Sequence, residues 1–488
     1  MNPTSVPGGA PAVEVRAPEE ARAPSSPHRP AWPTWRSGGW VLLVGLLLRE
    51  ALSFWTGHPY DLEVWIRTGY VVAHGINPYL HPWPAVPGVS FGYVDEPLPS
   101  AAYLPFWPLV FGGSYRLWEA VGGGNRFVLY FLLKQGPIAG DIATAALLYR
   151  YVLGATGDPK RAAAILAFWS FFPYDLLIGA VWGQLDPVTT AIVLVVLLVG
   201  ERKAASRNLL WGLGIFVKWI TAIYLPLELF LHRGLRRLWP FAGALLAFGL
   251  TILAFAAAGW SFTGLFATST SQSGGGGGGM NLAELFARPP LAGTLVAYPL
   301  LQTALEDLWI PVVFAAGWIG ARWMRWGGAG QEVRALLFVM TLFLLVRWGL
   351  YEQYLLYPFA LLLVDLYVYH PKRWGIFAFV AVAASAFLVT NSVLLVWFAT
   401  PIDPAAFTWT QAIDSSPFWG TVRYDLLDLF SVAVTAALAQ LAWVLYRDEA
   451  APVPWPCRLW PFGGRRGGPP ADRERAAAAE APTPAEGA

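Results

Sequence analysis

Long apolar runs separated by short polar connections fill most of the chain. Several runs reach the roughly 20 residues that a helix needs to cross a bilayer. Spans are expected at approximately 38–56, 130–153, 162–180, 187–200, 238–258, 306–323, 335–350, 355–369, 374–398 and 423–446. The pattern predicts an all-α polytopic membrane protein with roughly 10–12 transmembrane helices.

Two apolar stretches do not fit as simple crossings. Residues 208–231 lie between two basic clusters, so we expect a broken pair of short helices around Lys218 that enters the membrane and returns. Residues 100–129 contain Arg116, Arg126 and a run of three glycines, and they resemble amphipathic segments on the membrane surface. The first outer loop, 57–129, is therefore expected to contain membrane-surface helices.

Basic residues concentrate in alternate connections, which predicts the orientation of the chain. They cluster at 160–161, 202–207, 233–237, 322–334 and 372–373, and they are sparse at 57–99, 179–187, 259–307, 351–354 and 400–424. The positive-inside rule places the first set in the cytoplasm with both Arg-bearing tails. The second set then faces outward from the cell membrane.

Three further segments have compositions that predict their character. Residues 1–36 and 447–488 are rich in Pro, Ala and Arg, which predicts disordered cytoplasmic tails on either side of a transmembrane domain at 37–446. The outer loop 259–305 contains six consecutive glycines at 274–279. This run is either a flexible linker or part of a mobile lid over a site.

Composition supports the membrane class and narrows the chemistry. Hydrophobic residues make up 56% of the 488 residues and charged residues only 13%, against about 25% charged in soluble proteins. The single cysteine, Cys457, excludes an intramolecular disulfide and a thiolate-rich metal site. The six histidines show no zinc-ligand spacing.

Once the orientation is set, the unusual polar residues gather on the outer side. An acidic pair, Asp61 and Glu63, follows the first span and is the candidate catalytic site. The candidate substrate-binding residues are Lys134, Asp141, Gln184, Asp186, Arg347, Glu352, Gln353 and Arg423. Ionisable groups near or within spans are costly, so they are candidates for function. Cations would bind a phosphate, a carboxylate would accept a proton, and the other groups would orient hydroxyls.

Each of these residues also has a structural alternative. Lys134 could extend its ammonium to the interface, and it could equally pair with Asp141 two helical turns later. Asp186 could serve as a first-turn helix charge. Glu352 could be an exposed loop residue, and Arg423 could be an interfacial anchor.

Six segments resemble the polyprenyl-phosphate-sugar-dependent glycosyltransferases of the GT-C fold, in particular the glycosyltransferase 87 type and the catalytic subunit of the first GPI mannosyltransferase. They are PYDLEVWIRTGYVVAHGINPY at 59–79, AAYLPFWPL at 101–109, LLKQGPIAGDIATAALLYRYV at 132–152, WGQLDPVTTAIVLVVLL at 182–198, GLGIFVKWITAIYLP at 212–226 and YEQYLLYPF at 351–359. The chain has Asp-Leu-Glu where the family usually has Asp-X-Asp, which leaves the role of Glu63 open between placing the acceptor and sharing a divalent cation with Asp61.

The resemblance implies an inverting hexosyltransferase, with mannose the expected sugar. Asp61 would be the base, a polyprenyl-phosphate sugar the donor, and a lipid-linked or glycan molecule the acceptor. Lys134, Arg347 or Arg423 would stabilise the leaving phosphate, and the remaining polar candidates would position hydroxyls. The alternative is a polytopic transporter or lipid flippase, for which inverted repeats and interrupted helices would be typical. No nucleic-acid partner is expected.

Overall fold

The chain folds into helices throughout the part that the structure, a computed structural model, describes. That part comprises residues 32–80, 85–90, 103–200, 203–262, 279–288, 291, 297–327 and 330–448, and it contains no strand. The two expected tails, apart from 32–36 and 447–448, lie outside it, as do residues 274–278 of the glycine run. The linker, lid and tail assignments therefore stay predictions.

The first half of the described chain contains the helices that surround the acidic pair. They are α1 (Gly39–Trp55), α2 (Pro59–Ala73), α3 (Phe106–Ala120), α4 (Arg126–Thr156), α5 (Pro159–Ser170), the single turn α6 (Pro173–Asp175), a π-helix (Leu176–Trp182) and α7 (Asp186–Val199). Helix α4 packs against α1, α5 and α7, while α2 packs against α3. Helix α4 is thus the central element of this half.

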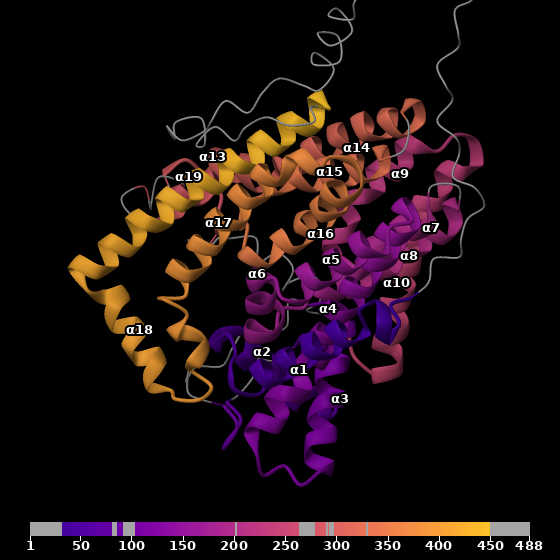
Figure 1. Ribbon diagram of the computed structural model, residues 1–488. Helices are drawn as coiled ribbons and strands as arrows, with labels where there is room; N and C mark the ends of the chain where they lie inside the picture. Colours follow the sequence, from indigo (N-terminus) through magenta and orange to yellow (C-terminus); the bar gives the residue numbers. More distant parts are fainter. Residues whose placement is uncertain are drawn as a thin grey trace, which may run out of the picture.

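The second half of the described chain continues as a further series of helices. They are α8 (Ala204–Val217), a 3-10 helix (Trp219–Tyr224), α9 (Leu225–Leu231), α10 (Trp239–Ala258), α13 (Pro299–Asp307), α14 (Trp309–Trp326), α15 (Gln331–Val346), a 3-10 helix (Glu352–Leu355), α16 (Leu356–Val364), α17 (Trp374–Asn391), α18 (Ala405–Ser415) and α19 (Pro417–Arg447). Helix α19 runs along one edge beside α15 and α17, and α1 to α3 lie toward the opposite side (Figure 1).

Local sequence explains where several helices begin and end. Asp158 caps α5 by accepting hydrogen bonds from the backbone N–H groups of Lys160 and Arg161, and Pro159 occupies the first turn. Ser416 caps α19 in the same way, again followed by a proline. Gly157 ends α4 with a φ of 65°, in the left-handed region that glycine adopts without steric cost.

Among the residues that the structure describes, five helical stretches are long and apolar enough to cross a membrane. They are Pro159–Trp182, Gly234–Ala258, Leu300–Trp326, Pro371–Asn391 and Pro417–Arg447. A sixth candidate is the pair Gly39–Trp55 and Pro59–Ala73, which is bent by 83°. The structure confirms that the described chain is all-helical and has several apolar helices suited to a membrane. The GT-C fold and the number of 10–12 spans stay predictions.

The two irregular stretches have the following structure. Helix α8 ends at Val217, Lys218 has extended backbone, and a 3-10 helix starts at Trp219, so the expected helix break at Lys218 is confirmed. In the 100–129 region, α3 is a regular helix packed against α2 and α4. The described part of 57–129 therefore contains the helices α2 and α3, and their location at a membrane surface stays a prediction.

Candidate functional site

Asp61 lies in the first turn of α2, immediately after the sharp bend that follows α1. His58 is the N-cap residue, and its ring Nδ1 accepts a hydrogen bond of 3.3 Å from the backbone N–H of Asp61. Pro59 occupies the first helical position, where its missing N–H costs nothing. The bend and the cap together fix the start of α2 and with it the position of the Asp61 carboxylate.

The Asp61 carboxylate is held by two side chains from the end of the π-helix. Its Oδ2 accepts hydrogen bonds of 2.6 Å from Trp182 Nε1 and 2.6 Å from Gln184 Nε2. Between them, Gly183 has a φ of 88°, which turns the chain as the π-helix ends. Within the described chain, Oδ1 accepts no hydrogen bond, and the Asp61 side chain is 16% exposed. One oxygen is therefore fixed and the other is available.

An aromatic wall supports this arrangement. The His58 ring stacks on Trp182, with centroids 4.5 Å apart, and on Trp397, with centroids 5.3 Å apart. Burial lowers the pKa of His58 below its usual value, although the nearby Asp61 charge acts in the opposite direction. We therefore expect a neutral imidazole near pH 7, which acts as a cap and a stacking partner rather than as a cation.

A second polar group, the Lys218 cluster, lies close to Asp61 and consists of Asp186, Lys218, Tyr354 and Tyr357. Lys218 Nζ is 2.6 Å from Asp186 Oδ2, and Tyr357 donates a hydrogen bond of 2.8 Å to Asp186 Oδ1. The Lys218 ammonium also lies over the Tyr354 ring, 5.1 Å from its centroid. Asp61 is near enough to act electrostatically on both Lys218 and Tyr354. The cation of this group therefore lies within electrostatic reach of the Asp61 carboxylate.

Tyr103, in the loop before α3, lies within electrostatic reach of both groups. It feels the negative charges of both Asp61 and Asp186, and its hydroxyl accepts a hydrogen bond of 3.4 Å from Trp65. Burial, reinforced by these carboxylates, raises the pKa of the Tyr103 hydroxyl well above its usual value. The hydroxyl therefore stays protonated and can donate a hydrogen bond.

Glu63 does not join Asp61. Residues two positions apart on a helix lie about 200° apart around its axis, so the two carboxylates point to opposite faces of α2. Glu63 is fully buried, 3.1 Å from Arg67 Nε, and accepts a hydrogen bond of 2.8 Å from Ser90. The pair therefore does not form a shared cation site. Over the described ranges, no group of three or more His, Cys, Asp or Glu side chains is placed to hold a metal ion.

Lys134 and Asp141 are both fully buried, and they do not pair with each other. Lys134 Nζ donates to the backbone carbonyls of Thr56, Ala180 and Val181 at 2.6, 3.1 and 3.0 Å. The structure thus places the Lys134 ammonium among backbone carbonyls and not at the Lys218 cluster.

Asp141 forms a buried ion pair with α1. Its Oδ2 is 2.6 Å from Arg49 Nε, and its Oδ1 accepts a hydrogen bond of 2.8 Å from Trp169. Arg49 also contacts Asp175 at 2.6 Å. This cluster connects α1, α4 and α6 inside the bundle.

Glu352 and Arg423 belong to an adjoining network. Asn391 donates a hydrogen bond of 2.8 Å to Glu352 Oε1, and Arg423 donates to the Asn391 backbone carbonyl at 2.8 Å while pairing with Asp414 at 3.0 Å. Burial raises the pKa of Glu352 to about 7. Tyr351 lies within electrostatic reach of both Glu352 and Asp61, so this network borders the Asp61 group.

Arg347 and Gln353 are the last two of the candidate substrate-binding residues. The Arg347 guanidinium lies over Trp219, 5.3 Å from the ring centroid, and over Trp309 at 6.0 Å. It also acts electrostatically on Tyr354, which places it near Lys218. Gln353 is 8% exposed, and its Oε1 has no hydrogen-bond donor within the described chain. Arg347 is therefore the second cation near the site.

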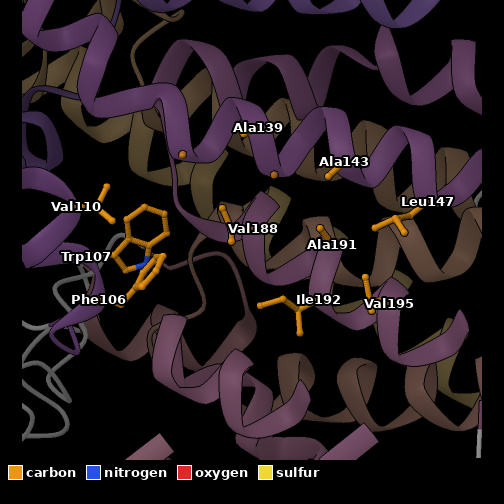
Figure 2. Close-up of a pocket in the computed structure, with 12 residues that line it drawn as sticks. Phe106, Trp107, Val110, Ala139, Ala143, Leu147, Val188, Ala191, Ile192 and Val195 are labelled. Atoms are coloured by element: carbon orange, nitrogen blue, oxygen red, sulfur yellow. The ribbon is translucent and has the colours of Figure 1, made fainter. Parts of the chain in front are cut away.

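An apolar groove of about 390 Å³ opens between α3, α4 and α7 (Figure 2). Small residues of α4, among them Ala139 and Ala143, line one side, and Val188, Ile192 and Val195 of α7 line the other. None of the four polar candidates Asp61, Lys134, Asp186 and Glu352 lines this groove. Val188, the first residue of α7 that lines the groove, stands two residues after Asp186.

Sequence reasoning missed Lys218, His58, Trp182 and Tyr357 as site residues. Trp182 is two residues from Gln184, and His58 is three residues from Asp61. This closeness in sequence was the signal that could have identified them as site residues. Lys218 was noticed only as the position of a helix break.

The sequence matches no known family model, no curated protein and no solved structure. A function therefore has to be argued from the site itself.

Proposed function

We propose that this protein is an integral membrane glycosyltransferase of the GT-C type. It would transfer a hexose, with mannose the expected sugar, from a polyprenyl-phosphate-sugar donor to a lipid-linked or glycan acceptor, with inversion. The reaction would take place on the outer face of the cell membrane, with both termini cytoplasmic. The observation that carries this proposal is the Asp61 carboxylate, which is fixed through Oδ2 and free at Oδ1 beside the Lys218 cluster.

The proposed chemistry assigns the proton to Asp61. Oδ1 takes the proton from the acceptor hydroxyl as that oxygen forms a bond to the anomeric carbon of the sugar. The bond from the anomeric carbon to the phosphate oxygen breaks, and the phosphate keeps the electron pair. The transition state resembles an oxocarbenium ion, as in other glycosyl transfers. A positioned base of this kind contributes about 10²–10⁴ in rate.

Lys218 and Arg347 are the cations proposed to bind the departing phosphate. Both act electrostatically on Tyr354, and Lys218 is also near Asp61. A fixed positive charge stabilises negative charge as it develops on the leaving group. Lys218 takes the role that the sequence assigned to Lys134, because the structure surrounds the Lys134 ammonium with carbonyls. Arg423 is paired with Asp414 and is given no part in binding the phosphate.

The apolar groove suits the prenyl chain of the donor. Its lining is aliphatic and aromatic, and it starts next to the Asp186 end of α7. A lipid tail placed there would keep its phosphate near Lys218. The neighbouring carboxylate and amide groups at Glu352, Gln353 and Asp186 would then orient sugar or acceptor hydroxyls.

The test is transfer of radiolabelled mannose from a polyprenyl-phosphate-mannose donor by the purified protein in lipid nanodiscs. Asp61→Asn should lower kcat at least 100-fold, because an amide cannot accept the proton. Asp403→Asn is the matched control, since Asp403 is an exposed carboxylate in the connection 400–424, which the sequence predicts to face outward. Wild-type transfer by Asp61→Asn would eliminate Asp61 as the base. Activity with a nucleotide sugar and no lipid donor would reject the donor class.

The helix break at Lys218 is also typical of transporters and flippases. The same nanodisc preparation separates the two functions, because a transporter would form no glycosidic product. Proton NMR of the product gives the anomeric configuration, which inversion predicts to be opposite to that of the donor.

A further inference from the structure

Lys134 is a buried cation whose three observed acceptors are all backbone carbonyls. Its ammonium has three N–H donors, and Thr56 O, Ala180 O and Val181 O lie 2.6, 3.1 and 3.0 Å from Nζ. The side chain has no exposed surface. No room or donor is left for a substrate phosphate, so the role of Lys134 must come from the segments it joins.

Those segments are the two that build the candidate site. Thr56 is the residue after α1, three residues before α2 begins, and it precedes Asp61 by five positions. Ala180 and Val181 lie in the last turn of the π-helix, directly before Trp182. One lysine on α4 therefore joins the backbone that carries the carboxylate to the backbone that carries its hydrogen-bond donors.

Each of the two segments ends a helix, so its last backbone carbonyls need a hydrogen-bond donor from elsewhere. The last carbonyls of a helix have no intrahelical partner, and an unsatisfied carbonyl away from water is costly. The Thr56 Oγ1 lies 2.7 Å from Leu52 O and 3.0 Å from Val181 O, so its single O–H proton is shared between the end of α1 and the end of the π-helix. Lys134 and Thr56 thus satisfy the end of the π-helix and fasten it to the end of α1.

Gly183 shows how closely the lysine stem is enclosed. A Cβ atom at this position would lie 2.9 Å from Lys134 Cγ and 3.0 Å from both Cδ and Cε. With a φ of 88°, Gly183 also has a backbone conformation that other residues adopt at a steric cost. The turn from Trp182 to Gln184 is therefore shaped around the Lys134 side chain.

We propose that Lys134 is a positioning residue, which holds Asp61 in register with Trp182 and Gln184 and contacts no substrate. This inference rests on the proposed role of Asp61 as the base. It replaces the expected function of Lys134 as a phosphate ligand, and it explains why an ammonium lies in the interior without a carboxylate partner.

The experiment compares Lys134→Met, Lys134→Arg and Gly183→Ala with the wild type in nanodiscs. Lys160→Met is the matched control, since Lys160 is exposed at the start of α5. Loss of positioning should lower kcat by about tenfold to 100-fold, with the donor KM within about threefold of wild type. Lys134→Arg should not restore kcat, because a planar guanidinium presents its donors in a different geometry. Gly183→Ala keeps the charge and should lower kcat in the same direction, which preserves the test if Lys134→Met does not fold.

A double-mutant cycle with Trp182→Phe separates positioning from a general loss of structure. If Lys134 acts through the Trp182–Asp61 contact, adding Lys134→Met to Trp182→Phe should cost clearly less than the product of the two single losses. Losses that simply multiply would overturn the proposal. So would a donor KM raised more than tenfold at unchanged kcat, which would mark Lys134 as a substrate ligand.

Hydrogen–deuterium exchange tests the same inference without any reaction. Peptides covering 55–62 and 180–186 should exchange at least tenfold faster in Lys134→Met than in wild type or Lys160→Met. Unchanged exchange in both peptides would refute the link between the segments. If the wild type transfers no sugar, the proposed function fails, and the exchange result still decides whether Lys134 joins these two segments.

Discussion

The hydrogen bond from Trp182 to Asp61 can be removed with little change in shape. Trp182→Phe deletes the indole N–H that donates to Asp61 Oδ2 at 2.6 Å, while an aromatic ring remains to stack on His58. Gln184 still donates to the same oxygen at 2.6 Å. The variant therefore tests how much the orientation of the carboxylate contributes to the proposed transfer.

The expected loss follows from the strength of this hydrogen bond. A hydrogen bond to a charged group contributes about 1.5–3 kcal/mol. Because Asp61 is 16% exposed and keeps its second donor, the lower end applies. About 1.5 kcal/mol corresponds to roughly a tenfold lower kcat at saturating donor. Trp409→Phe is the control, since the Trp409 indole on α18 is 48% exposed.

The assay measures initial rates of mannose transfer over a range of donor and acceptor concentrations. The loss should appear in kcat, because the missing bond orients the base and does not bind the donor. A Trp182→Phe variant within twofold of the wild-type kcat would refute the reasoning. A loss seen only as a higher KM for either substrate would do the same.

Three further outcomes are expected. Lys218→Met should lower kcat/KM for the donor by roughly tenfold, through loss of a cation that binds the phosphate and stabilises its developing charge, and Lys218→Arg should recover part of it; an unchanged kcat/KM in steady-state assays would contradict this. Because the pKa of Glu352 is raised from 4.5 to about 7, its contribution to stability is fully present below about pH 4.5 and is lost as the pH rises to about 7. That loss amounts to about 3 kcal/mol at most. The Asp403→Asn control should keep the full difference in Tm between pH 5 and pH 8, whereas Glu352→Gln should show a smaller difference. Ala143→Phe should narrow the groove and weaken transfer from long-chain donors only, and equal losses with short-chain donors would argue against a prenyl chain at this position.

Much of the helical framework could be predicted because its causes are local. The apolar runs that become α10 and α17 are long and uninterrupted, and burial in lipid or protein requires such runs to satisfy their own backbone. Asp158 before Pro159 and Ser416 before Pro417 signal helix starts in the sequence itself. The break at Lys218 followed from the basic clusters on either side of it.

The partners of the buried ions could not be predicted, because they come from distant parts of the chain. The rule that an ionisable group inside a span needs a partner drew attention to Asp141, with Lys134 as its candidate partner. Their spacing suggested each other, whereas the structure pairs Asp141 with Arg49, 92 residues earlier, and Lys134 with three carbonyls. Backbone carbonyls at helix ends carry no sequence signature, so a lysine that binds them looks like a lysine that binds a phosphate.

The separation of Asp61 from Glu63 has a different origin, since helix geometry alone requires it. The alternating spacing of the two carboxylates suits a strand or an extended loop, where residues two apart share a face. His58 and Pro59 instead start a helix, which turns the two side chains about 200° apart. One carboxylate then faces the donors at the π-helix end, while the other lies buried beside Arg67. A histidine cap followed by proline at the first position was thus the signal that only one of the two acids could serve the site.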